Sequence, residues 1–151
     1  MQVPEALRIW FIVHGVVDLV AALPLLVAPE VVLRALGWSC VDPAATRLVA
    51  SALLAIGGQS LLMRNASADV YRAMVSLKVI WSFAAAASLF VAIGGGAPAA
   101  TWGFMSIFIA FAGVWLHHAI RFRQLARLHA NQTDADTSRR DADADADTTD
   151  V

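Results

Sequence analysis

The sequence predicts an all-α integral membrane protein: an up-down four-helix bundle with a short interfacial helix in the first loop and a disordered acidic C-terminal tail. Of the 151 residues, 59% are hydrophobic and only 15% are charged, so the chain is far more apolar than an average soluble domain. The mean hydropathy is +0.65. Four long apolar runs and a change of composition after residue 130 support the same prediction.

The apolar runs have the length of membrane-spanning helices. Crossing about 30 Å of hydrocarbon at about 1.5 Å per residue takes about 20 helical residues. The runs that reach this length are residues 7–27, 44–63, 73–93 and 100–120. Residues 1–130 are therefore expected to form one transmembrane domain, in which short connections make sequential helices antiparallel neighbours.

The first connection predicts a short helix of its own. Pro29 and Glu30 supply a helix start with an acidic first turn, an apolar stretch follows, and Gly37 supplies the stop. Because this stretch is mostly apolar, we expect it to lie on the membrane surface.

Arginine residues predict how the spans are oriented. One side of the predicted membrane carries Arg8, Arg64, Arg72, Arg121, Arg123 and Arg127, and the other carries Arg34 and Arg47. Since positively charged flanks stay in the cytoplasm, both termini are expected to be cytoplasmic, with the protein in the plasma membrane.

The tail, residues 131–151, differs from the rest of the chain. It contains two arginines against seven aspartates, whereas residues 1–130 contain nine basic against five acidic residues. With no large apolar residue before Val151, it cannot bury enough surface to offset its ordering entropy, so we expect disorder.

Six polar groups lie about 6 to 15 Å inside the membrane, counted from the boundary arginines at about 1.5 Å per residue. This candidate intramembrane polar cluster comprises His14, Asp18, Gln59, Lys78, Trp81 and His117. Ionisable groups in a span cost at least about 2.5 to 3.5 kcal/mol each and usually have partners. An Asp18–Lys78 pair with a purely structural role is the first interpretation. The alternatives are a functional pocket, a Lys78 that reaches the headgroups, and an Asp18 held by His14 or by hydroxyls.

Small residues recur at helical spacing on the later spans. They are Ser51, Ala55 and Gly58 on the second, Ala84 and Ser88 on the third, and Ser106 and Ala110 on the fourth. Such faces let helix backbones approach closely, and we expect them to be the seams that close the bundle.

Known catalytic motifs are absent from the sequence. It contains no phosphate-binding glycine loop, no HExxH, no zinc spacing of Cys and His, and no GxSxG, and it has no basic domain for nucleic acid. No metal site and no cofactor are expected, with haem between two histidines or a quinone as the alternatives.

The stretch from Leu25 to Leu62 resembles small four-span prokaryotic membrane proteins of the DoxX-like kind. The resemblance rests on Ala-Pro-Glu after the first span, a short helix ending at Gly37-Trp38, and Arg47 followed by Leu-Leu-Ala-Ile-Gly-Gly. Some DoxX-like proteins are membrane subunits of quinone-linked oxidoreductases. The resemblance makes that role conceivable and assigns no catalytic residue.

The first functional hypothesis is a non-enzymatic accessory or interaction subunit that contacts lipids and either a second copy or a partner membrane protein. A module that binds or transports a lipid, quinone, small solute or proton is the alternative. A membrane subunit of a quinone-linked oxidoreductase is the third.

Overall fold

The protein is helical throughout the part of the chain that the structure describes. The computed structural model describes the backbone of residues 3–148 and the side chains of residues 3–124. The elements are α1 (Glu5–Val27), α2 (Pro29–Ala35), α3 (Pro43–Leu62), α4 (Ala68–Gly94) and α5 (Ala100–Thr148). Four helical segments are long and apolar enough to cross a membrane: α1, α3, α4 and residues Ala100–Gln124 of α5. The four predicted runs are therefore confirmed as helices of spanning length.

The starts of α3 and α4 show what the sequence indicates about helix boundaries. The Asp42 carboxylate accepts hydrogen bonds from the N–H groups of Ala44, at 2.9 Å, and Ala45, at 3.1 Å, and Pro43 occupies the first turn of α3. In contrast, α4 begins five residues before the apolar run starts, with Asp69 in its first turn. Hydropathy locates the apolar part of a helix, so it misses a polar first turn.

The short helix predicted in the first connection is confirmed as α2. It ends where Gly37 adopts a φ of 102°, in the left-handed region that favours glycine. The N–H of Gly37 then donates to Arg34 O and that of Trp38 donates to Leu33 O, both at 3.0 Å. The placement of α2 on the membrane surface stays a prediction.

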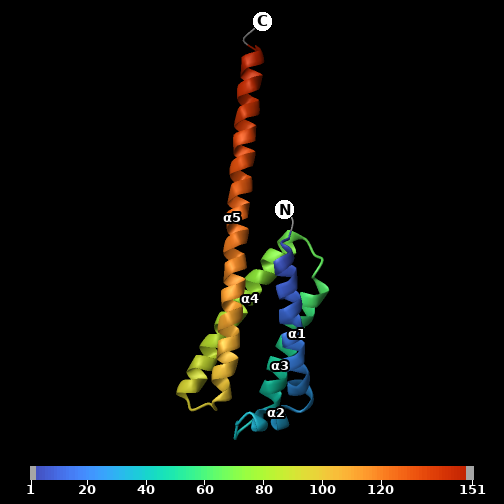
Figure 1. Cartoon of the computed structure of the whole chain (residues 1–151), viewed down its shortest axis with the longest axis vertical. Helices are drawn as coiled ribbons and strands as arrows, with labels where there is room; N and C mark the ends of the chain where they lie inside the picture. The colour runs from blue at the N-terminus through green and yellow to red at the C-terminus, as the bar shows by residue number, and fades with distance from the viewer. Residues whose placement is uncertain (1–2, 149–151) are drawn as a thin grey trace.

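The helices pack as two pairs, α1 with α3 and α4 with α5. The spans alternate in direction, so the start of α1 and the end of the fourth span lie at the same end of the molecule (Figure 1). At that end α4 approaches α1, and the two pairs diverge toward α2 and the α4–α5 turn (Figure 1). A single closed bundle of four equally packed helices is therefore not confirmed.

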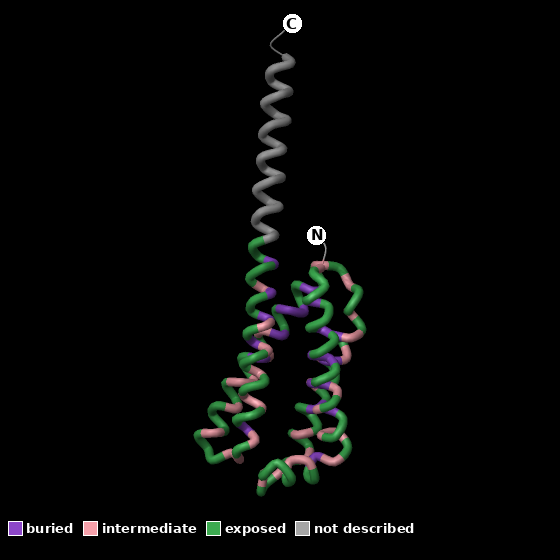
Figure 2. The backbone as a smooth tube through the Cα atoms, viewed as in Figure 1, coloured by how far each residue is buried: buried purple, intermediate pink, exposed green. Residues whose placement is uncertain are grey.

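The apolar core lies at the end where the pairs meet. Its buried members come from α1, α4 and α5: Leu7, Phe11, Tyr71, Met74, Val75, Trp115 and Phe122. The Tyr71 hydroxyl also donates to the backbone oxygen of Arg64 at 2.6 Å, which ties the α3–α4 connection to this core. Elsewhere most of the surface of the spans is exposed, as Figure 2 shows.

Glycine determines how closely α1 and α3 approach each other. A Cβ built on Gly57 would lie 2.5 Å from Asp18 Cβ and 3.1 Å from Gly15 O, so no side chain fits at this position. Close backbone approach at small residues is the usual packing mode of membrane helices. The crossing brings the Asp18 turn of α1 against α3.

Helix α5 continues beyond its spanning part to Thr148. It thus covers most of residues 131–151, for which the composition predicts disorder. The side chains of this tail lie outside the described residues, and the prediction of a disordered tail stays a prediction.

Candidate functional site

A buried ionisable network joins the two helix pairs. Lys78 Nζ of α4 lies 3.0 Å from His14 Nδ1 of α1 and donates a hydrogen bond to Ser60 Oγ of α3 at 2.7 Å. His14 Nδ1 lies 2.9 Å from Asp18 Oδ2 on the same helix. The exposed fractions of Lys78, His14 and Asp18 are 0%, 2% and 6%. A lysine of the second pair is therefore held by polar groups from both helices of the first.

Helical spacing accounts for the convergence. His14 and Asp18 are four residues apart and lie on the buried face of α1, which also carries Phe11, Gly15 and Ala22. Lys78 lies on the buried face of α4, four residues after Met74. The network forms where these two faces and α3 meet.

Aromatic rings surround the lysine and the histidine. Lys78 Nζ lies 5.1 Å from the centroid of the Phe11 ring and 4.9 Å from that of Trp115. The His14 ring makes edge contacts with Phe111, at 4.6 Å between centroids, and with Trp115, at 5.2 Å. Ring faces attract a cation most strongly where water is excluded, so these contacts stabilise a charged Lys78.

One nitrogen of His14 serves two neighbours. A neutral imidazole nitrogen either donates a hydrogen or accepts one. If Nδ1 accepts from Lys78, it has no hydrogen for Asp18; if it donates to Asp18, Lys78 loses its acceptor on the ring. Asp18 Oδ2 lies 2.9 Å from this nitrogen and has no other hydrogen-bond partner in the structure. Asp18, His14 and Lys78 are therefore linked through one ring nitrogen.

Three of the six residues predicted for the polar cluster meet there, namely His14, Asp18 and Lys78. Gln59 is exposed on α3, and His117 is exposed on α5 next to the buried His118. Trp81 is half-buried, and its indole nitrogen has no hydrogen-bond partner. The expected direct Asp18–Lys78 pair is not found, because the His14 ring nitrogen lies between the two side chains. This arrangement corresponds to the alternative in which His14 holds Asp18.

Ser60 belongs to the network but is not among the residues predicted from the sequence. The prediction names its neighbour Gln59, which has the longer polar side chain. Ser60 shares its helix face with Gly57 and Leu53, at spacings of three and four residues, and this face is the buried one. One residue is a rotation of about 100° around a helix, so Gln59 points away from the network. The 53-57-60 spacing was the signal that identified the buried face.

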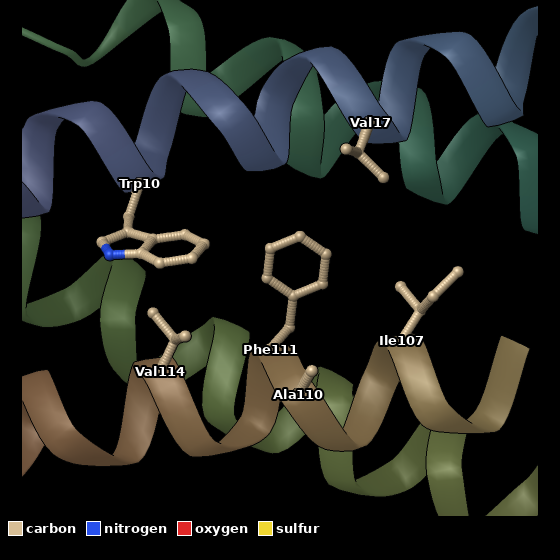
Figure 3. Close-up of a pocket in the computed structure, with 6 residues that line it drawn as sticks. All are labelled: Trp10, Val17, Ile107, Ala110, Phe111 and Val114. Carbon is tan, nitrogen blue, oxygen red and sulfur yellow. The ribbon is translucent and has the colours of Figure 1, made fainter. Parts of the chain in front are cut away.

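An apolar groove lies beside the network, between α1 and α5. It has a volume of about 310 Å³ and is lined by Trp10, Val17, Ile107, Ala110, Phe111 and Val114, which Figure 3 shows as sticks. The Phe111 ring belongs to both features, since it lines the groove and contacts His14. The groove itself offers no ionisable side chain to a ligand.

Among the described residues, no group of three or more His, Cys, Asp and Glu side chains is arranged to hold a metal ion. Comparison with family models, with curated proteins and with solved structures found no match to this chain.

Proposed function

We propose that this protein is a non-enzymatic interaction subunit of the membrane, which binds another membrane helix through the outer face of α3. That helix belongs to a second copy or to a partner membrane protein. The observation that carries the proposal is the small-residue face of α3, formed by Ser51, Ala55 and Gly58, which the protein's own helices leave open. We call it the α3 outer face.

The sequence predicts that such faces close the bundle, but the structure places them outside. Ser51 and Ala55 are exposed, and a Cβ built on Gly58 would meet nothing within 4 Å. The close α1–α3 crossing uses Gly15 and Gly57 instead. The α3 outer face is therefore not needed for packing within the described chain.

The α3 outer face has the chemistry of a helix–helix interface in lipid. Small residues let a second backbone approach, and van der Waals packing then drives association. The Ser51 hydroxyl donates to Arg47 O at 2.8 Å, so its hydrogen is satisfied within the helix and the face tolerates a dry environment.

The ionisable network supports a non-enzymatic role. Lys78 already uses its charge to connect α4 to His14 and Ser60, and the neighbouring groove is apolar. These groups are engaged in holding the two helix pairs together.

Ala55→Phe is expected to abolish the association, because a bulky ring on the α3 outer face prevents close backbone approach. The matched control is Val49→Phe, since Val49 is also exposed on α3 but lies two residues from Ser51, on a different side of the helix. Energy transfer between labelled copies in vesicles measures self-association, and quantitative mass spectrometry of gently purified protein measures a partner. Equal loss in both variants, or a wild-type protein that is monomeric and brings no partner, contradicts the proposal.

A further inference from the structure

We infer that the groove between α1 and α5 binds one acyl chain of an anionic phospholipid, with the lipid phosphate at Arg121. The site joins an apolar groove inside the membrane to Arg121, which lies beyond the end of the groove on the same face of α5. It is separate from the α3 outer face and independent of the interaction proposed there.

The lining selects a hydrocarbon chain. All six side chains that line the groove present apolar surface to it. The only polar atom among them is the indole nitrogen of Trp10. A polar solute would lose its hydrogen bonds to water here without replacement. An acyl chain loses none, and it gains contacts along Ala110, where the small side chain leaves room between Ile107 and Val114 (Figure 3).

The part of the groove at Val114 and Ala110 lies in the leaflet that borders Arg121. Ile107 and Val114 are seven residues apart, which is about 10 Å along α5, and Arg121 is another 10 Å or so beyond Val114. Half of a hydrocarbon layer of about 30 Å is about 15 Å. A chain whose headgroup is level with Arg121 therefore passes Val114 and Ala110 in the same leaflet.

Charge at the mouth of the groove favours an anionic headgroup. Arg121 is exposed and lies on the same face of α5 as Val114 and Ile107, at spacings of seven and fourteen residues. Basic residues at a membrane surface attract anionic lipid by about 1 kcal/mol each. A zwitterionic lipid would fill the same groove without this gain.

Trp10 marks the headgroup end. Its ring lies across the groove, and the indole nitrogen is on the side of the ring remote from Val17 and Ile107 (Figure 3). Tryptophan favours the membrane interface because its ring is apolar and its N–H donates to polar groups there. The indole is thus placed to donate to an ester oxygen of the bound lipid, which lies deeper than the phosphate at Arg121.

Native mass spectrometry of the detergent-purified full chain tests the inference. Phosphatidylglycerol and phosphatidylcholine with identical acyl chains are titrated separately. One tightly retained lipid is expected, with phosphatidylglycerol preferred about fivefold because Arg121 contributes about 1 kcal/mol. Equal retention of the two lipids overturns the assignment of an anionic headgroup.

Two variants separate the groove from the headgroup site. Ala110→Phe fills the groove and is expected to remove the retained lipid, whereas Ile109→Phe, on a neighbouring exposed face of α5, is expected to keep it. Arg121→Gln should reduce the preference for phosphatidylglycerol toward that for phosphatidylcholine while one lipid still binds. Wild-type retention by Ala110→Phe overturns the groove as the site, and an unchanged preference in Arg121→Gln overturns its role. Ala55→Phe should leave lipid retention unchanged, so failure here is distinct from failure of the proposed function.

Discussion

Lys78→Met should lower the free energy of unfolding by about 3–5 kcal/mol, the usual cost of removing one partner from a buried charged pair. Lys78 is fully buried and connects α4 to both His14 and Ser60, so its loss leaves Asp18 and His14 without their cationic neighbour. Unfolding in mixed micelles with increasing denaturing detergent, followed by helical circular dichroism, measures the change.

A double-mutant cycle with Asp18→Asn tests whether the network is coupled. Because the two groups communicate through His14 Nδ1, removing both charges should cost at least about 1 kcal/mol less than the sum of the single losses. Strict additivity would show that Asp18 and Lys78 act independently, contrary to the shared nitrogen described above.

Gly57→Ala should destabilise the protein by about 1–3 kcal/mol, the range found for overpacked sites. The added methyl would lie 2.5 Å from Asp18 Cβ, so α1 and α3 must separate and Asp18 must move relative to the network. The same detergent titration measures this loss.

Gly58→Ala is the matched control, because it makes the same chemical change one residue along the same helix. A Cβ at Gly58 meets nothing within 4 Å, and alanine favours helix by about 1 kcal/mol relative to glycine. We expect unchanged or slightly increased stability. Equal destabilisation by both substitutions would attribute the effect to the helix itself and would exclude the α1–α3 contact as the cause.

The spans were predictable from the sequence because hydropathy is a local property. Each run is long enough to cross the membrane by itself. The four helices Glu5–Val27, Pro43–Leu62, Ala68–Gly94 and Ala100–Gln124 match the expected ranges to within five residues at each end. The α2 helix was predictable for the same reason, since Pro29 and Gly37 act locally at its two ends.

The pairing of the helices and half of the site were not predictable in this way. His14, Asp18 and Lys78 could be predicted because an ionisable residue within a span needs a polar partner, whatever the rotation of its helix. Choosing between Gln59 and Ser60 needs the rotation of α3, which depends on the packing of Gly57 against Asp18. The sequence shows which residues are small. It does not show which of them contact another helix, as Gly57 does and Gly58 does not.

The order of the network along the chain has a consequence for biosynthesis. Lys78 follows His14 by 64 residues, so both helices of the first pair leave the ribosome before the lysine that joins them to the second. At about 5–20 residues per second, the delay is roughly 3 to 13 s. During that interval the Asp18 carboxyl group has been synthesised and its cationic neighbour has not.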